Sequence, residues 1–263
     1  MKLLAIGDPH GNINQIKKIP LKGVDVIVLT GDLGRVDLDR KMAFENLRRK
    51  NNGLPPKEFS AQQRRRAFMQ IYNSSIKVVS YLSKHAPVRT IYGNVEYTDK
   101  DTKKLSKKIG YNLPLLSKEL KKLKVKIIND TLLKINNTKI GGLKFFLDTN
   151  WVKDFKPTEY KKRMEKARKE TEKARQILQK FGKVDLLVCH QPPHGILDKV
   201  QSQHAPKNWQ GKHAGSKLIA DYIKKKQPKY VFCGHIHEGQ GSAKIGKTEV
   251  YNLGVCGWKM VEM

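Results

Sequence analysis

Two histidines stand two residues apart, directly after an apolar run near the end of the chain. They are His235 and His237, and a glycine separates them from residues 230–233. In extended chain, residues i and i+2 point to the same side, so two neutral imidazoles in this spacing form a natural pair of metal ligands. An isolated pair would more often be two surface histidines. The spacing therefore indicates a metal site only if further ligands follow other strands.

Further donors do follow other apolar runs, and each lies beside a glycine or another turn residue. They are Asp8, His10, Asp32, Asn94 and His190. A glycine lets the backbone turn sharply after a strand and expose the side chain that follows. Ligands and catalytic groups in open α/β sheets gather outside the carboxyl ends of the strands. Seven oxygen and imidazole donors in this pattern predict one shared metal centre.

The first half of the chain alternates short apolar runs with helical patterns, as βαβ units do. Strands are expected at residues 2–7, 24–30 and 88–93. Helices are expected at residues 12–19, capped by Asn12, and at residues 60–84, capped by Ser60. Residues 35–59 are polar and contain two adjacent prolines, so they are expected to form an irregular insertion.

From residue 125 the pattern changes to short strands with turn signals, interrupted by one long charged helix. Strands are expected at residues 125–128, 131–135, 139–147, 184–189, 229–234, 241–246 and 248–254. Glutamates and lysines at helical spacing predict a helix over residues 157–181. The sequence shows no internal repeat and no Gly/Ser linker. We therefore expect one domain over residues 1–263, with basic helical insertions near 35–85 and 155–181.

The charge of the chain is strongly positive, with a formal net charge of +29. A field of this sign favours phosphate-bearing partners and is compatible with non-specific nucleic-acid binding. Lysines outnumber arginines 42 to 11 and are spread along the whole chain, whereas base readout favours clustered arginine forks. Aromatic residues make up only 8%, so a stacking platform for single strands is not evident. The charge alone does not decide the function.

Membrane and redox signals are weak. The N-terminal apolar run is too short for a signal peptide, and no stretch approaches a membrane span, so we expect a cytoplasmic protein with no membrane partner. Cys189, Cys233 and Cys256 lie far apart and show no C-x-x-C spacing. We expect buried, reduced thiols, with a soft-metal or redox role as the alternative. The oligomeric state is not indicated.

The order of the donor motifs resembles the calcineurin-like metallophosphoesterase superfamily. The motifs D-x-H, G-D, G-N, H and G-H-x-H stand here at Asp8 and His10, Asp32, Asn94, His190, and His235 and His237. The last two motifs are also similar, locally, to those of class III cyclic-nucleotide phosphodiesterases and brain-type metallophosphoesterase-domain proteins. We expect a member of phosphodiesterase type, and a prokaryotic one because some prokaryotic members share the small apolar residue found at Val95. The resemblance implies an α/β fold, a four-layer α-β-β-α sandwich with a dinuclear metal site at the carboxyl ends of strands.

The resemblance also implies which side chains hold which metal. It assigns Asp8, His10, Asp32 and His237 to one ion and Asp32, Asn94, His190 and His235 to the other, so that Asp32 bridges. Mixed carboxylate, amide and imidazole ligands suit two divalent ions, with Mn²⁺ favoured and Fe, Zn²⁺ or Ni²⁺ as alternatives. Two such ions acidify a bridging water and clamp phosphoryl oxygens for in-line attack.

The implied function is a metal-dependent phosphoesterase that hydrolyses phosphodiester bonds in a phosphate-ester substrate by attack of a metal-bridging hydroxide. A first alternative, suggested by the charge, is a nuclease acting on DNA or RNA. A second is a non-enzymatic scaffold of the same fold, like the retromer subunit that shares it. That type of protein loses metal-site residues, whereas all seven donors are present here.

Two positions depart from the family pattern. Members often have G-D-x-x-D after the second strand, and the last position here is Arg35. Most members have a histidine directly after G-N, which contacts substrate phosphate or protonates the leaving group, and here Val95 and Glu96 follow. Valine cannot donate a proton, so either the leaving group departs unaided or His194 or His213 serves. The expected catalytic residues are thus Asp32, Asn94, His194 and His213.

Overall fold

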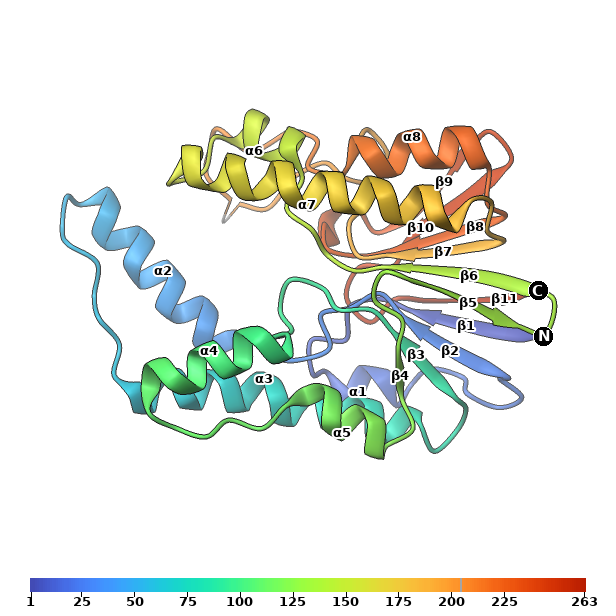
Figure 1. Cartoon of the computed structure of the whole chain (residues 1–263), viewed down its shortest axis with the longest axis horizontal. Helices are drawn as coiled ribbons and strands as arrows, with labels where there is room; N and C mark the ends of the chain where they lie inside the picture. Colours follow the sequence, from blue (N-terminus) through green and yellow to red (C-terminus); the bar gives the residue numbers. More distant parts are fainter. Residues whose placement is uncertain (204) are drawn as a thin grey trace.

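Two β-sheets lie face to face with helices on both outer faces, as Figure 1 shows. The computed structural model describes residues 1–203 and 205–263. Within these residues, one sheet has the strand order β11-β1-β2-β3-β4 and the other has the order β5-β6-β7-β8-β10-β9. The protein is therefore the α/β, four-layer α-β-β-α sandwich that the motif order implied.

The first sheet is built around β1 and β2, whose side chains are buried on both faces. Its strands are β1 (Lys2–Ile6), β2 (Val26–Leu29), β3 (Val88–Thr90) and β4 (Lys126–Ile127), which run parallel, and β11 (Trp258–Glu262), which runs antiparallel to β1. Leu4 and Ile27 point outward to the helices, whereas Leu3 and Val28 point inward to the second sheet. Burial on both faces explains why these strands read as continuous apolar runs.

The second sheet has four parallel central strands and an antiparallel strand at each edge. Its strands, in spatial order, are β5 (Thr131–Ile135), β6 (Thr138–Leu143), β7 (Leu186–Cys189), β8 (Tyr230–Cys233), β10 (Thr248–Asn252) and β9 (Gly241–Ile245). Phe232 and Leu186 face the first sheet and help to form the core between the two sheets. The parallel strands of each sheet end at the same edge, where their following loops meet.

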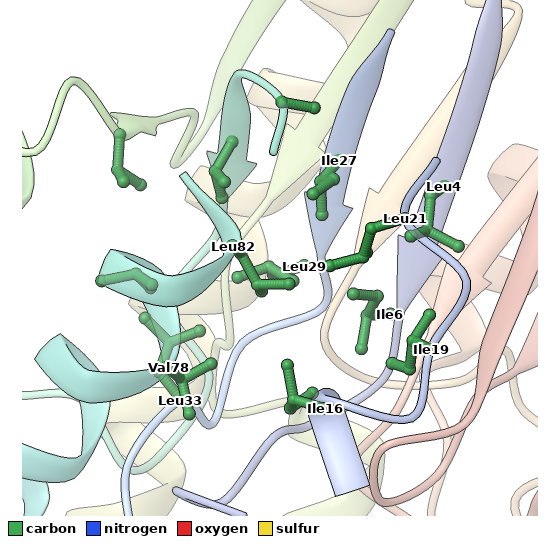
Figure 2. Packing of buried hydrophobic residues seen from close by; sticks show 14 of the residues in the cluster. Leu4, Ile6, Ile16, Ile19, Leu21, Ile27, Leu29, Leu33, Val78 and Leu82 are labelled. Carbon is green, nitrogen blue, oxygen red and sulfur yellow. The ribbon is translucent and has the colours of Figure 1, made fainter. Parts of the chain in front are cut away.

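Helices cover the outer faces and form the walls above the strand ends. The elements on the side of the first sheet are α1 (Ile13–Ile16), α2 (Asp37–Asn51), α3 (Ala61–Leu82), α4 (Asp99–Ile109) and α5 (Leu116–Lys122). Those on the side of the second are α6 (Thr149–Phe155), α7 (Tyr160–Phe181) and α8 (Lys217–Lys226). Figure 2 shows Val78 and Leu82 of α3 packed against Leu29 and Leu33. This packing fixes the position of the loop that follows β2.

The expected insertion at residues 35–59 proves to be largely helical, which corrects the prediction of irregular structure. Helix α2 has no buried residue and extends away from the body of the molecule in Figure 1. Because no face of α2 packs into the core, its sequence lacks the apolar periodicity by which an amphipathic helix is recognised. The helix expected at residues 12–19 is also shorter than predicted and comprises only α1.

Helices α6 and α8 and strand β11 were not expected from the sequence. Helix α8 carries an N-cap, because the Ser216 hydroxyl accepts a hydrogen bond from the Ile219 amide, and its apolar residues are buried. The capping box of α3 at Ser60 is present as expected. In the described chain no helix combines the length and apolar character needed to cross a membrane. Cys189, Cys233 and Cys256 are free thiols, and the first two are buried.

Candidate metal centre

The ends of five parallel strands bring the seven predicted donors to one edge of the sandwich. Asp8 and His10 follow β1, Asp32 follows β2 and Asn94 follows β3. From the other sheet, His190 follows β7, and His235 and His237 follow β8. Two groups of side chains each have ligand atoms within 4.8 Å of one another, and they are Asp8, His10 and His237, and Asp8, Asp32 and His190.

One half of the centre is formed by Asp8, His10 and His237. The Nε2 atoms of His10 and His237 lie only 3.3 Å apart, and His237 Nε2 lies 3.3 Å from Asp8 Oδ2. Asp32 approaches the same group, with its Oδ2 atom 3.7 Å from His10 Nε2. The hydroxyl of Thr30 donates a 2.6 Å hydrogen bond to Asp8 Oδ1, so this carboxylate is held in place from behind.

The other predicted half contains Asn94, His190 and His235. His190 Nε2 lies 2.9 Å from Asn94 Oδ1 and 3.5 Å from Asp32 Oδ1. His190 Nδ1 lies 2.9 Å from the carbonyl oxygen of Thr30, which can only accept, so Nδ1 carries the proton and the neutral ring presents a lone pair at Nε2. The ring of His235 lies 4.9 Å from that of His190. The two oxygens of Asp32 therefore approach different halves of the centre.

The donor set fits a cation. Carboxylate oxygens, an amide oxygen and neutral imidazole nitrogens are all acceptors, and here several of them face one another at 2.9 to 3.7 Å. A buried acceptor needs a partner, and mutually facing acceptors are satisfied by a metal ion placed between them. Asp8, Asp32 and His190 are buried, so bulk water does not serve as the hydrogen-bond partner of these acceptors. Mixed oxygen and imidazole ligation of this type suits Mn²⁺, Fe, Zn²⁺ or Ni²⁺.

The backbone is strained where it presents the donors. His10, Asp32 and His235 have φ values of 42°, 45° and 67°, in the left-handed region that residues other than glycine rarely adopt. Such strain gathers at functional sites, where the surrounding structure enforces it. A side chain at Gly93 would collide with the carboxylate of Asp32, and one at Gly234 would collide with that of Asp8. The glycines of the motifs thus make room for the carboxylates.

Glu96 is a structural support of the centre that the sequence did not reveal. Its buried carboxylate accepts hydrogen bonds from the backbone amides of Asp32 at 3.1 Å, Leu33 at 2.6 Å and Gly93 at 2.8 Å. It therefore ties the turn after β2 to the turn after β3. Arg35, which stands where relatives often carry a carboxylate, is exposed and lies 3.5 Å from Asp37. The signal in the sequence was an acidic residue two positions after Asn94.

The pKa values of the centre diverge because the groups are buried together. Burial and the charge of Asp8 raise the pKa of Asp32 to about 8. Burial also raises the pKa of Asp8, but His190 and His237 outweigh that effect and lower it to about 2. Burial lowers the pKa of His10 to about 4, and burial together with His190 lowers that of His235 to about 3. Both imidazoles are therefore neutral at pH 7 and available as ligands.

The metal-free protein is expected to lose about 2 kcal/mol of unfolding free energy between pH 6.5 and pH 8. The pKa of Asp32 is higher in the folded than in the unfolded state, so its contribution to stability is present at low pH and is lost as pH rises toward 8. The lowered pKa values of His10 and His235 oppose this loss only below about pH 6.5, because a histidine in the unfolded chain takes up a proton only below its ordinary pKa. Urea unfolding of chelator-treated protein at three pH values measures the change.

The matched variants for this test are Asp32→Asn and Asp37→Asn. Burial and the charge of Asp32 also raise the pKa of Glu96 to about 7, so Glu96 contributes to the fall in stability as well. Asp32→Asn should therefore reduce the fall to the part that comes from Glu96, whereas Asp37→Asn, at an exposed position in α2, should retain all of it. A flat profile in the wild-type protein, or an equal fall in both variants, would show that Asp32 does not hold a proton in the folded, metal-free state.

Two cavities open at the metal centre. The first, of about 990 Å³, is lined by residues that include His10, Asp32 and His237. The second, of about 720 Å³, shares Asn94 and His235 with the first. Both cavities therefore reach predicted donors.

The two histidines that were candidates for a proton donor lie together, outside the lining of both cavities. The rings of His194 and His213 are 5.6 Å apart. His213 Nδ1 lies 2.6 Å from Asp198 Oδ1, and the buried carboxylate of Asp198 also accepts from the backbone amides of Gly195 and Gly215. This arrangement organises the loop before α8. A catalytic role for either histidine stays a prediction.

Comparison with known proteins agrees with the geometry. Residues 1–239 match the family of calcineurin-like phosphoesterases, and this span contains all seven donors. The chain belongs to the calcineurin-like phosphoesterase family. The family implies a phosphoester substrate and divalent metal ions, and the side chains at the edge of the sandwich offer the ligands for such ions.

The chain is similar to known proteins over different lengths. Metallophosphoesterase domain-containing protein 1 of Homo sapiens and of Mus musculus is 38% identical over 74 residues, which are 28% of this chain and 21% of the relative. The aligned chain thus spans about a fifth of these curated relatives. The phosphopantetheinyl hydrolase of Mycobacterium tuberculosis has a TM-score of 0.56 at 13% identity, over 99% of this chain and 95% of that one. A second solved chain has a TM-score of 0.52 at 15% identity, over 97% and 90%. At these identities the structures share the fold.

Proposed function

We propose that the protein is a dinuclear metal-dependent phosphoesterase that hydrolyses phosphodiester bonds. The observation that carries this proposal is the position of Asp32, whose Oδ2 approaches His10 in one half of the centre and whose Oδ1 approaches His190 in the other. A carboxylate in this position suits a bridge between two cations. Asp8, His10 and His237 would complete one site, and Asn94, His190 and His235 would complete the other.

The bound metals would activate water and neutralise the developing charge on the phosphoryl group. The chain itself positions the ligands. The Thr30 carbonyl fixes the tautomer of His190, and the backbone amide of Val95 donates a 3.0 Å hydrogen bond to Asp32 Oδ1. Asn94 and His235 line both cavities, so both would face a phosphate that lies over the centre.

A preference for diesters is supported by the two cavities and by Val95. A phosphodiester carries two ester arms, and a cavity opens on each side of the centre to receive them. The Val95 side chain is buried and lines the first cavity, and it offers no hydrogen-bond donor where most relatives have a histidine. Without that donor, the site makes one hydrogen bond fewer to the dianionic phosphate of a monoester.

The direct test is a screen of chelator-treated protein resupplied with Mn²⁺, Fe²⁺, Zn²⁺ or Ni²⁺. Bis(p-nitrophenyl) phosphate should be hydrolysed only with added metal, and faster than p-nitrophenyl phosphate. The Asp8→Ala variant serves as the control for a contaminating phosphatase. If neither ester is cleaved with any of the metals, the proposal of a phosphoesterase is wrong and the non-enzymatic scaffold becomes the better proposal.

Duplex DNA is expected to bind in a salt-sensitive manner and to remain uncut. Lysines spread over the surface neutralise phosphates but supply no groove-reading element, so the binding should not depend on sequence. Plasmid nicking assays with each metal at physiological salt measure this, with the Asp8→Ala variant beside the wild type. Metal-dependent nicking that disappears in Asp8→Ala would favour the nuclease instead.

A further inference from the structure

The metal centre lies between two cavities whose walls differ in chemistry. The first cavity is bordered by α2, α3 and α4, and the second by α6 and α7. Figure 1 shows α6 and α7 on one side of the strand ends and α2 and α4 on the other. Asn94, His235 and Lys166 line both cavities, so a phosphate at the centre would direct one ester arm into each.

The first cavity, between α2, α3 and α4, has four cations on its wall. They are Arg40 of α2, Arg64 of α3, and Lys104 and Lys108 of α4. The two lysines are four residues apart and so lie on one face of α4. In the described part of the chain, none of the four has a carboxylate within 4.0 Å. Positive groups from three separate helices thus converge beside the metal centre, and within the described residues none of them forms an ion pair. Arg64 Nε donates a 3.3 Å hydrogen bond to the carbonyl oxygen of Phe59.

Acidic groups in the same cavity do not cancel this charge. Three carboxylates line it apart from Asp32 and Glu96, and they are Asp39, Asp101 and Glu238. Asp101 is engaged at the start of α4, where its carboxylate accepts a hydrogen bond from the Thr98 hydroxyl. Lys166 adds a fifth cation and lies 3.6 Å from Glu170. Outside the metal centre and its support Glu96, the lining therefore has five cations and three carboxylates.

The second cavity has charged side chains of α7 in its lining, and aromatic and aliphatic side chains near the metal centre. Of its cations, Lys162, Lys166 and Lys169 each lie within 4.0 Å of a glutamate three or four residues away, whereas Arg163 forms no ion pair among the described residues.

The apolar side chains of the second cavity are the larger part of its wall beside the predicted ligands. They are Phe145, Phe146, Leu147 and Trp151. The ring of Phe145 lies 5.4 Å from that of His235, so this apolar wall begins directly at the predicted ligands. Trp151 is held by Phe155, with ring centroids 5.3 Å apart and planes at 15°. A rigid aromatic surface of this kind suits a flat or apolar group.

We propose that the substrate is a phosphodiester with one arm that bears a second anionic group and a second arm that is apolar or aromatic. Arg40, Arg64, Lys104 and Lys108 bind the anionic arm, and the cavity of Phe145 and Trp151 receives the other arm. This substrate class rests on the proposed phosphodiesterase function and adds to it the recognition of the arms. The four cations are positioned for binding and take no part in the bond cleavage.

The test uses three p-nitrophenyl phosphodiesters with the same aromatic leaving group. Their second arms are methyl, choline and 2-phosphonoethyl, which are neutral, cationic and anionic. At low ionic strength, kcat/KM should be highest for the anionic arm, about tenfold above the methyl ester, because several partly exposed charge pairs add. It should be lowest for the choline ester, and the differences should shrink as salt screens the charges.

Two double variants on α4 test the position of the anionic arm. Lys104→Gln with Lys108→Gln should remove most of the preference for the 2-phosphonoethyl ester and leave the methyl ester nearly unchanged. Lys103→Gln with Lys107→Gln removes the same charge from the same helix outside the cavity lining, and should keep the preference. Glutamine has nearly the helix propensity of lysine, so α4 is preserved in both.

The outcomes separate the two proposals. Hydrolysis of all three esters at similar kcat/KM, or an equal loss of preference in both double variants, would overturn the anionic-arm proposal and leave the phosphodiesterase standing. A complete lack of hydrolysis with every metal would overturn the phosphodiesterase, and the substrate class with it.

Discussion

Asp32→Asn is expected to lower kcat by roughly 10³-fold or more and to reduce the metal content below that of the His235→Ala and His237→Ala variants. Asp32 approaches the Nε2 atom of His10 through Oδ2 and the Nε2 atom of His190 through Oδ1. Asp8 also lies near both halves, but it reaches His190 at Nδ1, the atom that carries the proton. An asparagine has one neutral oxygen in place of the carboxylate and leaves the positive charge of two ions uncompensated. Each histidine, in contrast, belongs to one half only.

Elemental analysis of the purified variants, together with their kcat values, measures this effect. Asp37→Asn is the matched control, because Asp37 is exposed in α2 and pairs with Arg35 away from the centre. The control should retain wild-type metal content and rate. Retention of two metal ions per chain in Asp32→Asn would show that Asp32 does not bridge.

Hydrolysis rates in the wild-type protein are expected to fall steeply as the pKa of the leaving group rises. Val95 supplies no proton to the leaving oxygen, and neither His194 nor His213 lines the cavities. General-acid assistance is typically worth about 10² to 10⁴-fold and would narrow the difference in rate between alkyl and aryl phosphodiesters, so without it this difference should keep its full intrinsic size. The measurement is kcat/KM over a graded series of phosphodiesters.

The rival account has His194 or His213 as the proton donor. It predicts a shallow dependence on the leaving group in the wild-type protein, and a selective loss on alkyl esters in either His194→Ala or His213→Ala. Our account expects the two alanine variants to keep the wild-type dependence of kcat/KM on the pKa of the leaving group. A flat wild-type series would refute the account in which the leaving group departs unaided.

The seven predicted donors lie together because each follows a parallel strand whose position is set by local apolar patterning. Runs such as the one before Asp8 show in the sequence as buried strands, and the carboxyl ends of neighbouring parallel strands meet at one edge. Local patterning was therefore sufficient to predict that these side chains share one edge, and the family resemblance carried by the motif order predicted the four-layer fold. Their assignment to individual metals stays a prediction.

Other features depend on contacts that no local pattern encodes. Helix α2 packs no face into the core, so its residues lack the apolar periodicity that marked α3. Glu96 joins two turns through three backbone amides, and only the folded chain shows which amides these are. The four cations beside the centre come from three helices and span more than 60 residues of chain, from Arg40 to Lys108.

The most direct measurement of the dinuclear account is an anomalous difference map from crystals grown with Mn²⁺. We expect two peaks about 3.5–4 Å apart, one on each side of the Asp32 carboxylate, the separation typical of two-metal phosphoesterases. Asp8, His10 and His237 should surround the first peak, and Asn94, His190 and His235 the second. A single peak, or two peaks that do not share Asp32, would contradict the account.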